Sequence, residues 1–186
     1  MKKVLVIFIA FVVMSSYAKA QVMTKGDNAL NFGIGVPALG AGVKMSMPAI
    51  VAAFDHGFSD KLGIGYITGG AQLAFSGGGN TIWGVDYSYT YLTVGPRAAY
   101  HFDFYEMTGG KSAFEKLDIY AGVLLGFTIA TSKYDDGFTT PTSSTNVSFT
   151  EDVFIGIRYS FSGSLGVYAE TGYNVSFLNA GLTLRF

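Results

Sequence analysis

The segment Leu178-Asn-Ala-Gly-Leu-Thr-Leu-Arg-Phe186 alternates apolar and polar side chains without a break. Successive side chains of an extended strand point to opposite faces, so this segment has one apolar face and one polar face. A soluble sheet would bury such an apolar face in a core. Here the strand ends a chain that begins with an export signal, and this combination favours a strand whose apolar face meets lipid.

The first twenty residues have the pattern of a secretory signal peptide. Lys2 and Lys3 precede an apolar run over residues 4–14, and Ala18-Lys19-Ala20 is a small-x-small cleavage site. The run is too short for a membrane anchor, because crossing a hydrocarbon layer takes about 20 residues. We therefore expect a signal peptide at residues 1–20 and one mature domain at residues 21–186. The chain has no cysteine, which excludes disulfides and a lipid-modified cysteine anchor.

The composition favours a membrane protein built from strands. The chain holds 25 glycines, 16 phenylalanines and 12 tyrosines, with only 13% charged residues, whereas an ordinary globular domain has about 25%. Beyond the signal no apolar run is long enough for a membrane helix. In lipid, the remaining way to satisfy every backbone polar group is a closed barrel. Acidic residues outnumber basic ones in the mature chain, so no nucleic-acid partner is expected.

Eight segments have roughly the 9–11 residues, or slightly more, that a tilted membrane strand needs. They are residues 29–37, 47–58, 62–75, 87–102, 117–131, 147–161, 165–173 and 176–186. The glycines of the third segment permit a bulge and leave its register open. The predicted fold is all-β, an eight-stranded antiparallel up-and-down transmembrane β-barrel.

The connections between these segments differ in length. Residues 59–61 and 162–164 are predicted to be tight turns on the periplasmic side. Residues 77–86 and 135–146 are polar and are predicted to be the longer loops of the outer side. The connection at 103–116 is long for a periplasmic turn, and a small helix or flap is expected there.

The strand number, its even parity, the export signal and the ending Leu182-x-Leu184-x-Phe186 make residues 21–186 resemble a small eight-stranded outer-membrane barrel of the OmpA/OmpX type. The resemblance implies a monomer in the cell outer membrane, surrounded by outer-membrane lipids. In that family the terminal aromatic strand is read by the barrel-assembly machinery. The same assembly role is therefore implied for Leu182, Leu184 and Phe186.

Strand parity predicts what fills the barrel. An eight-stranded barrel is just wide enough inside for side chains. If the apolar faces meet lipid, six charged residues point inward, namely Asp55, Arg97, Asp118, Arg158, Glu170 and Arg185. Unpaired buried charges cost several kcal/mol, so three acids and three arginines predict an internal ion-pair network, with Arg158 and Glu170 as one candidate pair. The alternative is that Asp118 and Arg185 lie in water near the rim.

No catalytic site is predicted. The two histidines, His56 and His101, both fall at strand ends expected to face the periplasm. An acyl-transfer or deacylation site, as in some outer-membrane barrels, would need a histidine at the outer end.

Cofactor and metal sites are not predicted either. Residues 33–38 formally match a dinucleotide fingerprint, but Pro37 and the glycines after it begin no helix. The pairs Asp135-Asp136 and Glu151-Asp152 lack a calcium-ligand loop and are interpreted as solvated loop charge.

These expectations favour a plugged barrel that serves envelope structure or surface interaction. With the wall committed to lipid and the lumen to packed side chains, any surface ligand is expected at the loops 77–86 and 135–146, which as an alternative form an inert hydrophilic cap. Two other functions stay open. One is a narrow pore or hydrophobic-molecule conduit, and the other is a soluble secreted β-sandwich or lipocalin-like binder.

Overall fold

The structure is a computed structural model that describes residues 22–39, 42–82, 85–135, 137, 140 and 142–186. The predicted signal peptide at residues 1–20 lies outside the described residues.

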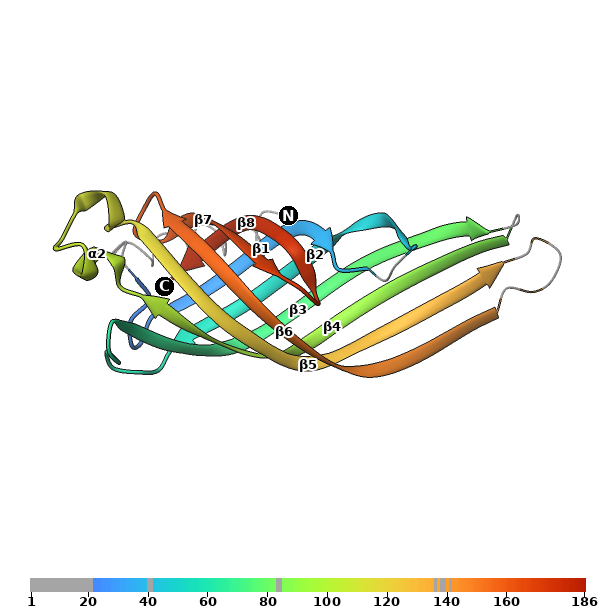
Figure 1. The fold of residues 1–186 in the computed structure, drawn as a ribbon, viewed down its shortest axis with the longest axis horizontal. Coiled ribbons are helices and arrows are strands. Elements are labelled where there is room, and N and C mark those ends of the chain that lie inside the picture. Colours follow the sequence, from blue (N-terminus) through green and yellow to red (C-terminus); the bar gives the residue numbers. More distant parts are fainter. Residues whose placement is uncertain (1–21, 40–41, 83–84, 136, 138–139, 141) are drawn as a thin grey trace, which may run out of the picture.

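Eight antiparallel strands form a closed barrel in which each strand pairs with the next and β8 pairs with β1 (Figure 1). The strands are β1 (Asn28–Pro37), β2 (Lys44–Gly57), β3 (Gly65–Ile82), β4 (Val85–Phe102), β5 (Leu117–Asp135), β6 (Thr142–Ser160), β7 (Leu165–Gly172) and β8 (Ser176–Arg185). The predicted fold class is confirmed, and every predicted segment overlaps one strand.

The wall of the barrel is apolar outside and polar inside, the reverse of a water-soluble protein. Large apolar side chains at alternate positions are exposed: Phe32, Ile34, Ile50, Leu73, Val94, Val123, Leu125, Phe127, Val153, Ile155, Ile157, Val167, Leu178 and Leu182. The residues between them are buried and many are polar or charged: Asn31, Asp55, Thr68, Gln72, Arg97, His101, Asp118, Arg158, Glu170, Asn179, Thr183 and Arg185. This distribution suits a wall surrounded by hydrocarbon.

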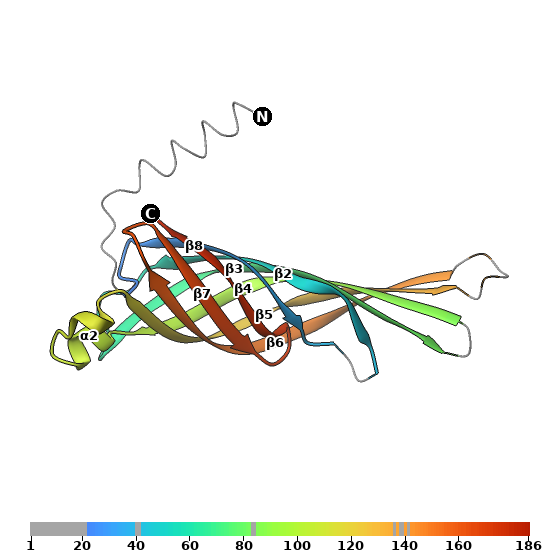
Figure 2. The same ribbon diagram turned by 90° about the horizontal axis from the view of Figure 1, so that it is seen from above.

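Four strands are much longer than the barrel. The β3–β4 and β5–β6 hairpins continue beyond it at one end, as Figures 1 and 2 show. We call this part, formed by residues 76–82, 85–92, 129–135 and 142–149, the extension. Backbone pairing runs unbroken through it, from Ile82↔Val85 to Asp86↔Asp135 and Tyr134↔Thr142.

The prediction of loops at 77–86 and 135–146 was therefore wrong for most of their length. Residues 77–82 pair with β4, and residues 142–146 pair with β5. These stretches lack an apolar face because both of their faces meet solvent, so the alternation used to recognise strands is missing. Backbone pairing with the neighbouring strand holds these residues in strand structure, although their side chains show no apolar alternation.

The register of the third strand is regular, and the irregularity lies on its neighbour. Pairing of β3 with β4 shows no shift, whereas the pairing of β2 with β3 shifts between Met45 and Met47 and again between Met47 and Ile50. Pro48 lies in this stretch and has no N–H to give to a ladder, which accounts for a bulge there.

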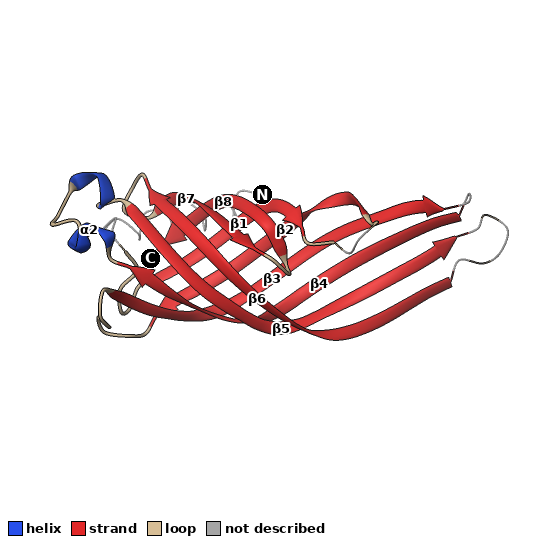
Figure 3. Cartoon of the chain, in the orientation of Figure 1, coloured by secondary structure: helices blue, strands red, loops and turns tan. Residues whose placement is uncertain are grey.

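The opposite end carries the connection at 103–116, which forms helix α2 (Phe104–Met107) and a 3₁₀ helix (Ser112–Phe114) (Figure 3). The Asp103 carboxylate accepts a hydrogen bond from the backbone N–H of Glu106 at 3.0 Å and so caps α2. The expectation of a small helix is confirmed. The predicted tight turn at 59–61 is part of a longer connection, because β3 begins only at Gly65.

Among the residues that the structure describes, no helix has the length and apolar character needed to cross a membrane.

The seam between β1 and β8 closes the barrel. The backbone N–H of Asn28 donates to Phe186 O and the N–H of Phe186 donates to Asn28 O, both at 3.0 Å. Further along, Gly33 faces Gly181, and the Tyr168 hydroxyl lies against Gly33. A Cβ on Gly181 would meet the Phe32 carbonyl and lie 2.5 Å from Gly33 Cα. The seam therefore has no room for a side chain at this position.

The variant Gly181→Ala is expected to lower the free energy of unfolding by about 1–3 kcal/mol, because the added carbon collides with the β1 backbone. The matched control Ala180→Val adds carbon on the exposed outer face one residue away and should change stability by less than about 0.5 kcal/mol. Urea unfolding of the two refolded variants in lipid vesicles measures both values. Equal stabilities would contradict a sterically tight seam.

Candidate functional site

The lumen gathers the six charged residues that strand parity places inside. Each comes from a different strand, and each is at most 3% exposed: Asp55 (β2), Arg97 (β4), Asp118 (β5), Arg158 (β6), Glu170 (β7) and Arg185 (β8). Side chains of a strand alternate between its two faces, so inward side chains of different strands meet in the lumen, and five of the six, all but Arg185, form one layer.

Asp55 is the centre of this layer. Its Oδ1 lies 3.0 Å from Arg97 Nε, an ion pair whose angle falls outside hydrogen-bond geometry, and its Oδ2 accepts from Arg158 Nη2 at 3.1 Å. The Asn31 amide donates to the same Oδ2 at 3.3 Å. One carboxylate thus faces both guanidinium groups.

Arg97 extends the layer toward β7. Its Nη2 donates to Glu170 Oε1 at 2.6 Å and its Nη1 donates to Gln72 Oε1 at 2.7 Å. The Tyr120 hydroxyl donates to Glu170 Oε1 at 2.9 Å. The Arg97 guanidinium also lies 4.1 Å from the centre of the Phe154 ring, a cation–π contact.

Arg158 extends the layer in the other direction, toward β5. Its Nη1 donates to Asp118 Oδ2 at 2.9 Å, and Asp118 Oδ1 lies 2.8 Å from His101 Nδ1. The other ring nitrogen of His101 is 3.1 Å from the Thr68 hydroxyl. Asp118 is thus enclosed by two partners and does not lie in water at a rim.

The predicted pair of Arg158 with Glu170 was wrong. Each charge has other partners, because Arg158 stands directly opposite Asp118 in the β5–β6 register, while Gly156 stands opposite Glu170. Directly opposite residues have the closest Cβ atoms across a sheet, so the register decides which charges meet.

Arg185 lies nearer the mouth at the α2 end. Its Nη2 donates to Asp27 Oδ2 at 2.9 Å and to the Val22 carbonyl at 3.4 Å. The segment 22–27 crosses the opening there, and Met23 is completely buried. Asp27 was not among the predicted residues, because it precedes the first strand and belongs to no alternating pattern.

Other lumen residues were also missed by the sequence analysis. His101 was expected at a strand end facing the periplasm, but it is completely buried and stacks on Tyr120 with ring centroids 4.9 Å apart. Its position could have been inferred from Arg97, since residues four apart in a strand share a face. By contrast, His56 lies on an exposed contact, 2.9 Å from Asn28 Oδ1.

The arrangement fills the lumen with paired side chains. Three carboxylates face two guanidinium groups and the His101 imidazole, and each carboxylate and each guanidinium has at least one partner within 3.1 Å. Across the described ranges, no group of three or more His, Asp or Glu side chains is placed to hold a metal ion.

Above this layer, toward the extension, the lumen opens into a cup. A cavity of about 200 Å³ is lined by small and hydroxyl-bearing side chains that include Ala49, Ser76, Tyr91 and Ser148. On its wall the hydroxyls of Thr93, Thr128 and Thr150 form a chain with oxygen–oxygen distances of 2.7 Å.

One carboxylate interpreted as solvated charge is in fact buried at the rim of this cup. Asp152 accepts hydrogen bonds from the backbone N–H groups of Tyr173, Asn174 and Val175 at 3.0, 3.1 and 3.3 Å. Its neighbour Glu151 is exposed. Asp152 therefore holds the β7–β8 turn, and the prediction of a solvated pair was wrong for it.

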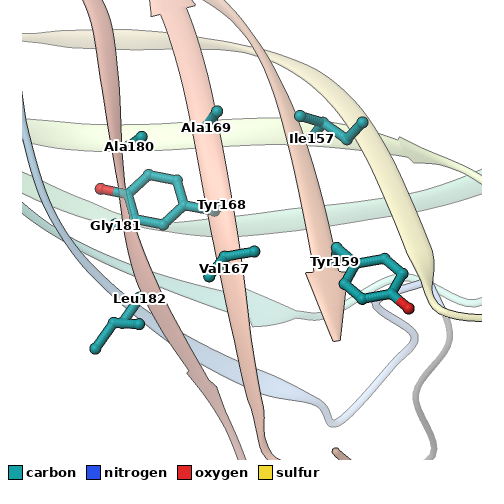
Figure 4. A pocket seen from close by; sticks show the side chains of 8 residues that line it. All are labelled: Ile157, Tyr159, Val167, Tyr168, Ala169, Ala180, Gly181 and Leu182. Carbon is teal, nitrogen blue, oxygen red and sulfur yellow. The ribbon is translucent and has the colours of Figure 1, made fainter. Parts of the chain in front are cut away.

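The outer wall has a groove of about 550 Å³ over β6, β7 and β8 (Figure 4). It is lined by Ile157, Tyr159, Val167, Tyr168, Ala169, Ala180, Gly181 and Leu182. The small side chains of Ala169 and Ala180 make the depression, and its lining is almost wholly apolar. The groove suits the acyl chain of a surrounding lipid.

No protein-family model and no curated protein matches the sequence. Among solved structures, the chain is similar to Ail, the attachment invasion locus protein of Yersinia pestis, with 12% identity, a TM-score of 0.49, and coverage of 88% of this chain and 100% of that one. It is also similar to the N-terminal β-barrel domain of Pseudomonas aeruginosa OprF, with 13% identity, a TM-score of 0.44, and coverage of 88% and 100%. It is similar to Neisserial surface protein A as well, with 15% identity, a TM-score of 0.39, and coverage of 86% of this chain and 93% of that one. The likenesses are distant, so the closed eight-stranded barrel rests on the strand pairing of this chain.

A double-mutant cycle tests the ion pairs. Arg97→Leu and Glu170→Leu should each cost about 3–5 kcal/mol, because each leaves a buried charge without its main partner. The double variant should cost less than the sum, with a coupling energy of about 0.5–3 kcal/mol. The control cycle joins Arg158→Leu with Glu170→Leu, whose charges share no bond, and should give the smaller coupling. A larger coupling in the control cycle would show that the pairing is misassigned.

Asp152→Ala should lower the free energy of unfolding by about 1–3 kcal/mol, since three backbone N–H groups lose their acceptor. Glu151→Ala is the matched control and should stay within about 0.5 kcal/mol of the parent, because this side chain is exposed. Chemical unfolding in detergent micelles measures both. If Glu151→Ala is the more damaging variant, the support of the β7–β8 turn has been assigned to the wrong carboxylate.

Proposed function

We propose that this chain is an integral outer-membrane barrel with a lumen plugged by side chains, and that it presents the extension at the cell surface for interaction. Residues 1–20 are the signal peptide cleaved on export, and the α2 end faces the periplasm. The observation that carries the proposal is the reversed wall, which exposes residues such as Ile34 and Leu125 and buries Arg97 and Arg158 completely or nearly so.

The reversed wall argues against a soluble binder. A lipocalin-like protein needs a polar exterior and an apolar interior large enough for a ligand, and a β-sandwich needs two separate sheets. This chain has one closed sheet, an exterior of large apolar side chains and an interior of ion pairs. In water such an exterior would drive aggregation, whereas in hydrocarbon it is stable.

The charged layer argues against a pore. Charged side chains from five strands, β2, β4, β5, β6 and β7, meet across the lumen at hydrogen-bond distances, and Met23 is completely buried at the mouth of the α2 end. An ion would have to separate Arg97 from Glu170 or Arg158 from Asp118, and each of these four side chains is buried from solvent. The apolar groove on the outer wall is open to the surrounding lipid and leads to no channel.

Assembly and surroundings follow from the same proposal. Leu182 and Leu184 lie on the outward face of β8 and Phe186 directly follows this strand, and we assign to these three residues recognition by the barrel-assembly machinery. Outer-membrane lipids cover the wall, and the protein is a monomer without a cofactor. The surface ligand is bound by the extension, because it is the part of the chain that projects furthest from the barrel.

The experiment is expression in a Gram-negative host, followed by membrane fractionation and gel electrophoresis with and without boiling. The protein should be found in the outer membrane and should migrate differently before and after boiling, since closed barrels resist detergent until heated. Planar-bilayer recording should detect no stable conductance. Recovery in the soluble fraction with unchanged migration contradicts the barrel, and a large stable conductance favours the pore.

A shortened variant isolates the role of the extension. Replacing residues 78–89 and 132–144 with short Gly-Ser turns should leave heat-dependent migration intact, because the barrel keeps all eight paired strands below these points. Any binding of intact cells to a surface ligand should be lost. Retained binding would place the ligand site on the wall or in the cup.

A further inference from the structure

The inner face of the extension continues the lumen side of β3, β4, β5 and β6. Alternate residues of these strands share this face, because the β3–β4, β4–β5 and β5–β6 registers run without a shift from the barrel to the tip. We call it the tyrosine face. Its residues are Ser76, Gly78, Asn80, Tyr87, Tyr89, Tyr91, Ala130, Ser132, Tyr134, Thr142, Ser144 and Asn146.

Three tyrosines form a line along the centre of this face. Tyr87, Tyr89 and Tyr91 are successive inward residues of β4, spaced by about 7 Å along the strand, and all three are half-buried. Tyr87 packs edge-on against Tyr134 of β5 with ring centroids 5.5 Å apart. At the foot of the line, Tyr91 lines the 200 Å³ cavity of the cup.

The residues beside the line are small. Tyr89 lies between Gly78 and Ser132, and Tyr91 lies between Ser76 and Ala130 in the register. No bulky neighbour on β3 or β5 covers these two rings. Both rings are only half-buried, so a ligand that runs along β4 into the cup can reach them.

The tyrosine face is polar but carries no charge. Its groups beyond the phenols are hydroxyls and amides, such as those of Ser144 and Asn146 on β6. The charged residues of the extension, Asp86, Lys133 and Asp135, occupy the alternate positions that point to the opposite face. Complementarity therefore favours a neutral ligand with many hydrogen-bonding groups and disfavours a sulfated or phosphorylated one.

We propose that the tyrosine face binds a neutral oligosaccharide, with sugar rings stacked on Tyr89 and Tyr91 and one end of the oligosaccharide in the cup. A pyranose ring has an apolar C–H surface that fits an aromatic ring and a rim of hydroxyls that fits Ser, Thr and Asn side chains. The cup supplies further hydroxyls from Thr93, Thr128 and Thr150. The proposal rests on the proposed function, in that the extension must lie outside the membrane to meet such a ligand.

The test uses the full mature chain folded in nanodiscs and titrated by calorimetry with maltopentaose, cellopentaose and chitopentaose. At least one of these neutral sugars should bind at millimolar concentration or below. Tyr89→Ala and Tyr91→Ala should each weaken that binding by about tenfold, the loss expected for one stacked ring. Tyr89→Phe keeps the ring and should stay within about threefold of the parent.

Two controls test whether binding depends on the tyrosine face itself and on a ligand without charge. Thr90→Ala removes a side chain from the same strand on the opposite face and should leave affinity unchanged. A heparin-derived sulfated pentasaccharide should bind no more tightly than the best neutral sugar. The proposal is overturned if no neutral sugar binds, if Tyr89→Ala binds as the parent does, or if the sulfated sugar binds best.

The experiments tell a failure of the sugar-binding proposal apart from a failure of the proposed function. Heat-dependent migration of each variant reports whether the barrel is folded, and fractionation reports its location, independently of any sugar. A protein that folds in the outer membrane and binds none of the three sugars refutes the ligand class alone. A soluble protein refutes the location, while its calorimetry still decides whether the tyrosine face binds sugar.

Discussion

The structure depends on the closure of one hydrogen-bonded ring of strands. In hydrocarbon no water satisfies an open strand edge, so a sheet can be stable there only when its first and last strands pair. In this chain β1 and β8 meet along nearly their whole length, from Ala29↔Arg185 to Pro37↔Ser176. The closed sheet has an outer surface and an inner surface with different surroundings. Because side chains alternate along a strand, each one belongs to either the outer or the inner surface.

Closure also explains why the interior is charged. The lumen of an eight-stranded barrel is narrow, so a carboxylate on one strand reaches a guanidinium on a strand across the ring. Asp55 on β2 reaches Arg97 on β4 and Arg158 on β6 in this way. The same narrowness explains the glycine pair Gly33 and Gly181, which leaves space for Tyr168 against the seam. Charge and shape are thus both consequences of ring size.

The sequence predicts the barrel well because apolar and polar side chains alternate along the strands of its wall. Residues 178–186 alternate strictly and residues 153–161 do so except at Phe154, and the structure places a strand over each stretch. The six inward charges could be identified for the same reason. Their partners could not, because pairing requires the register: Asp118 stands opposite Arg158, a relation between two strands that neither strand shows alone. His101 and Asp27 were missed because one lies near a strand end and the other precedes the first strand.

The extension was missed for a different reason. A strand wetted on both sides has no need of apolar residues, so Thr142-Ser-Ser-Thr-Asn146 reads as a loop although it is paired throughout. Alternation detects contact with lipid or a core and not strand structure itself. Elements that project from a barrel into water are therefore the part of such a chain that side-chain pattern describes least well.

The unequal heights of the wall have a further consequence. At the level of the cup β7 ends at Gly172 and β8 begins at Ser176, whereas β3 to β6 continue far past it. The wall around the opening of the cup is therefore high on the side of β3 to β6 and low on the side of β7 and β8. A long molecule that lies along the inner face of the extension can therefore reach the cup past the β7–β8 turn. Asp152 holds the β7–β8 turn in place, so the shape of this low side depends on a single buried carboxylate.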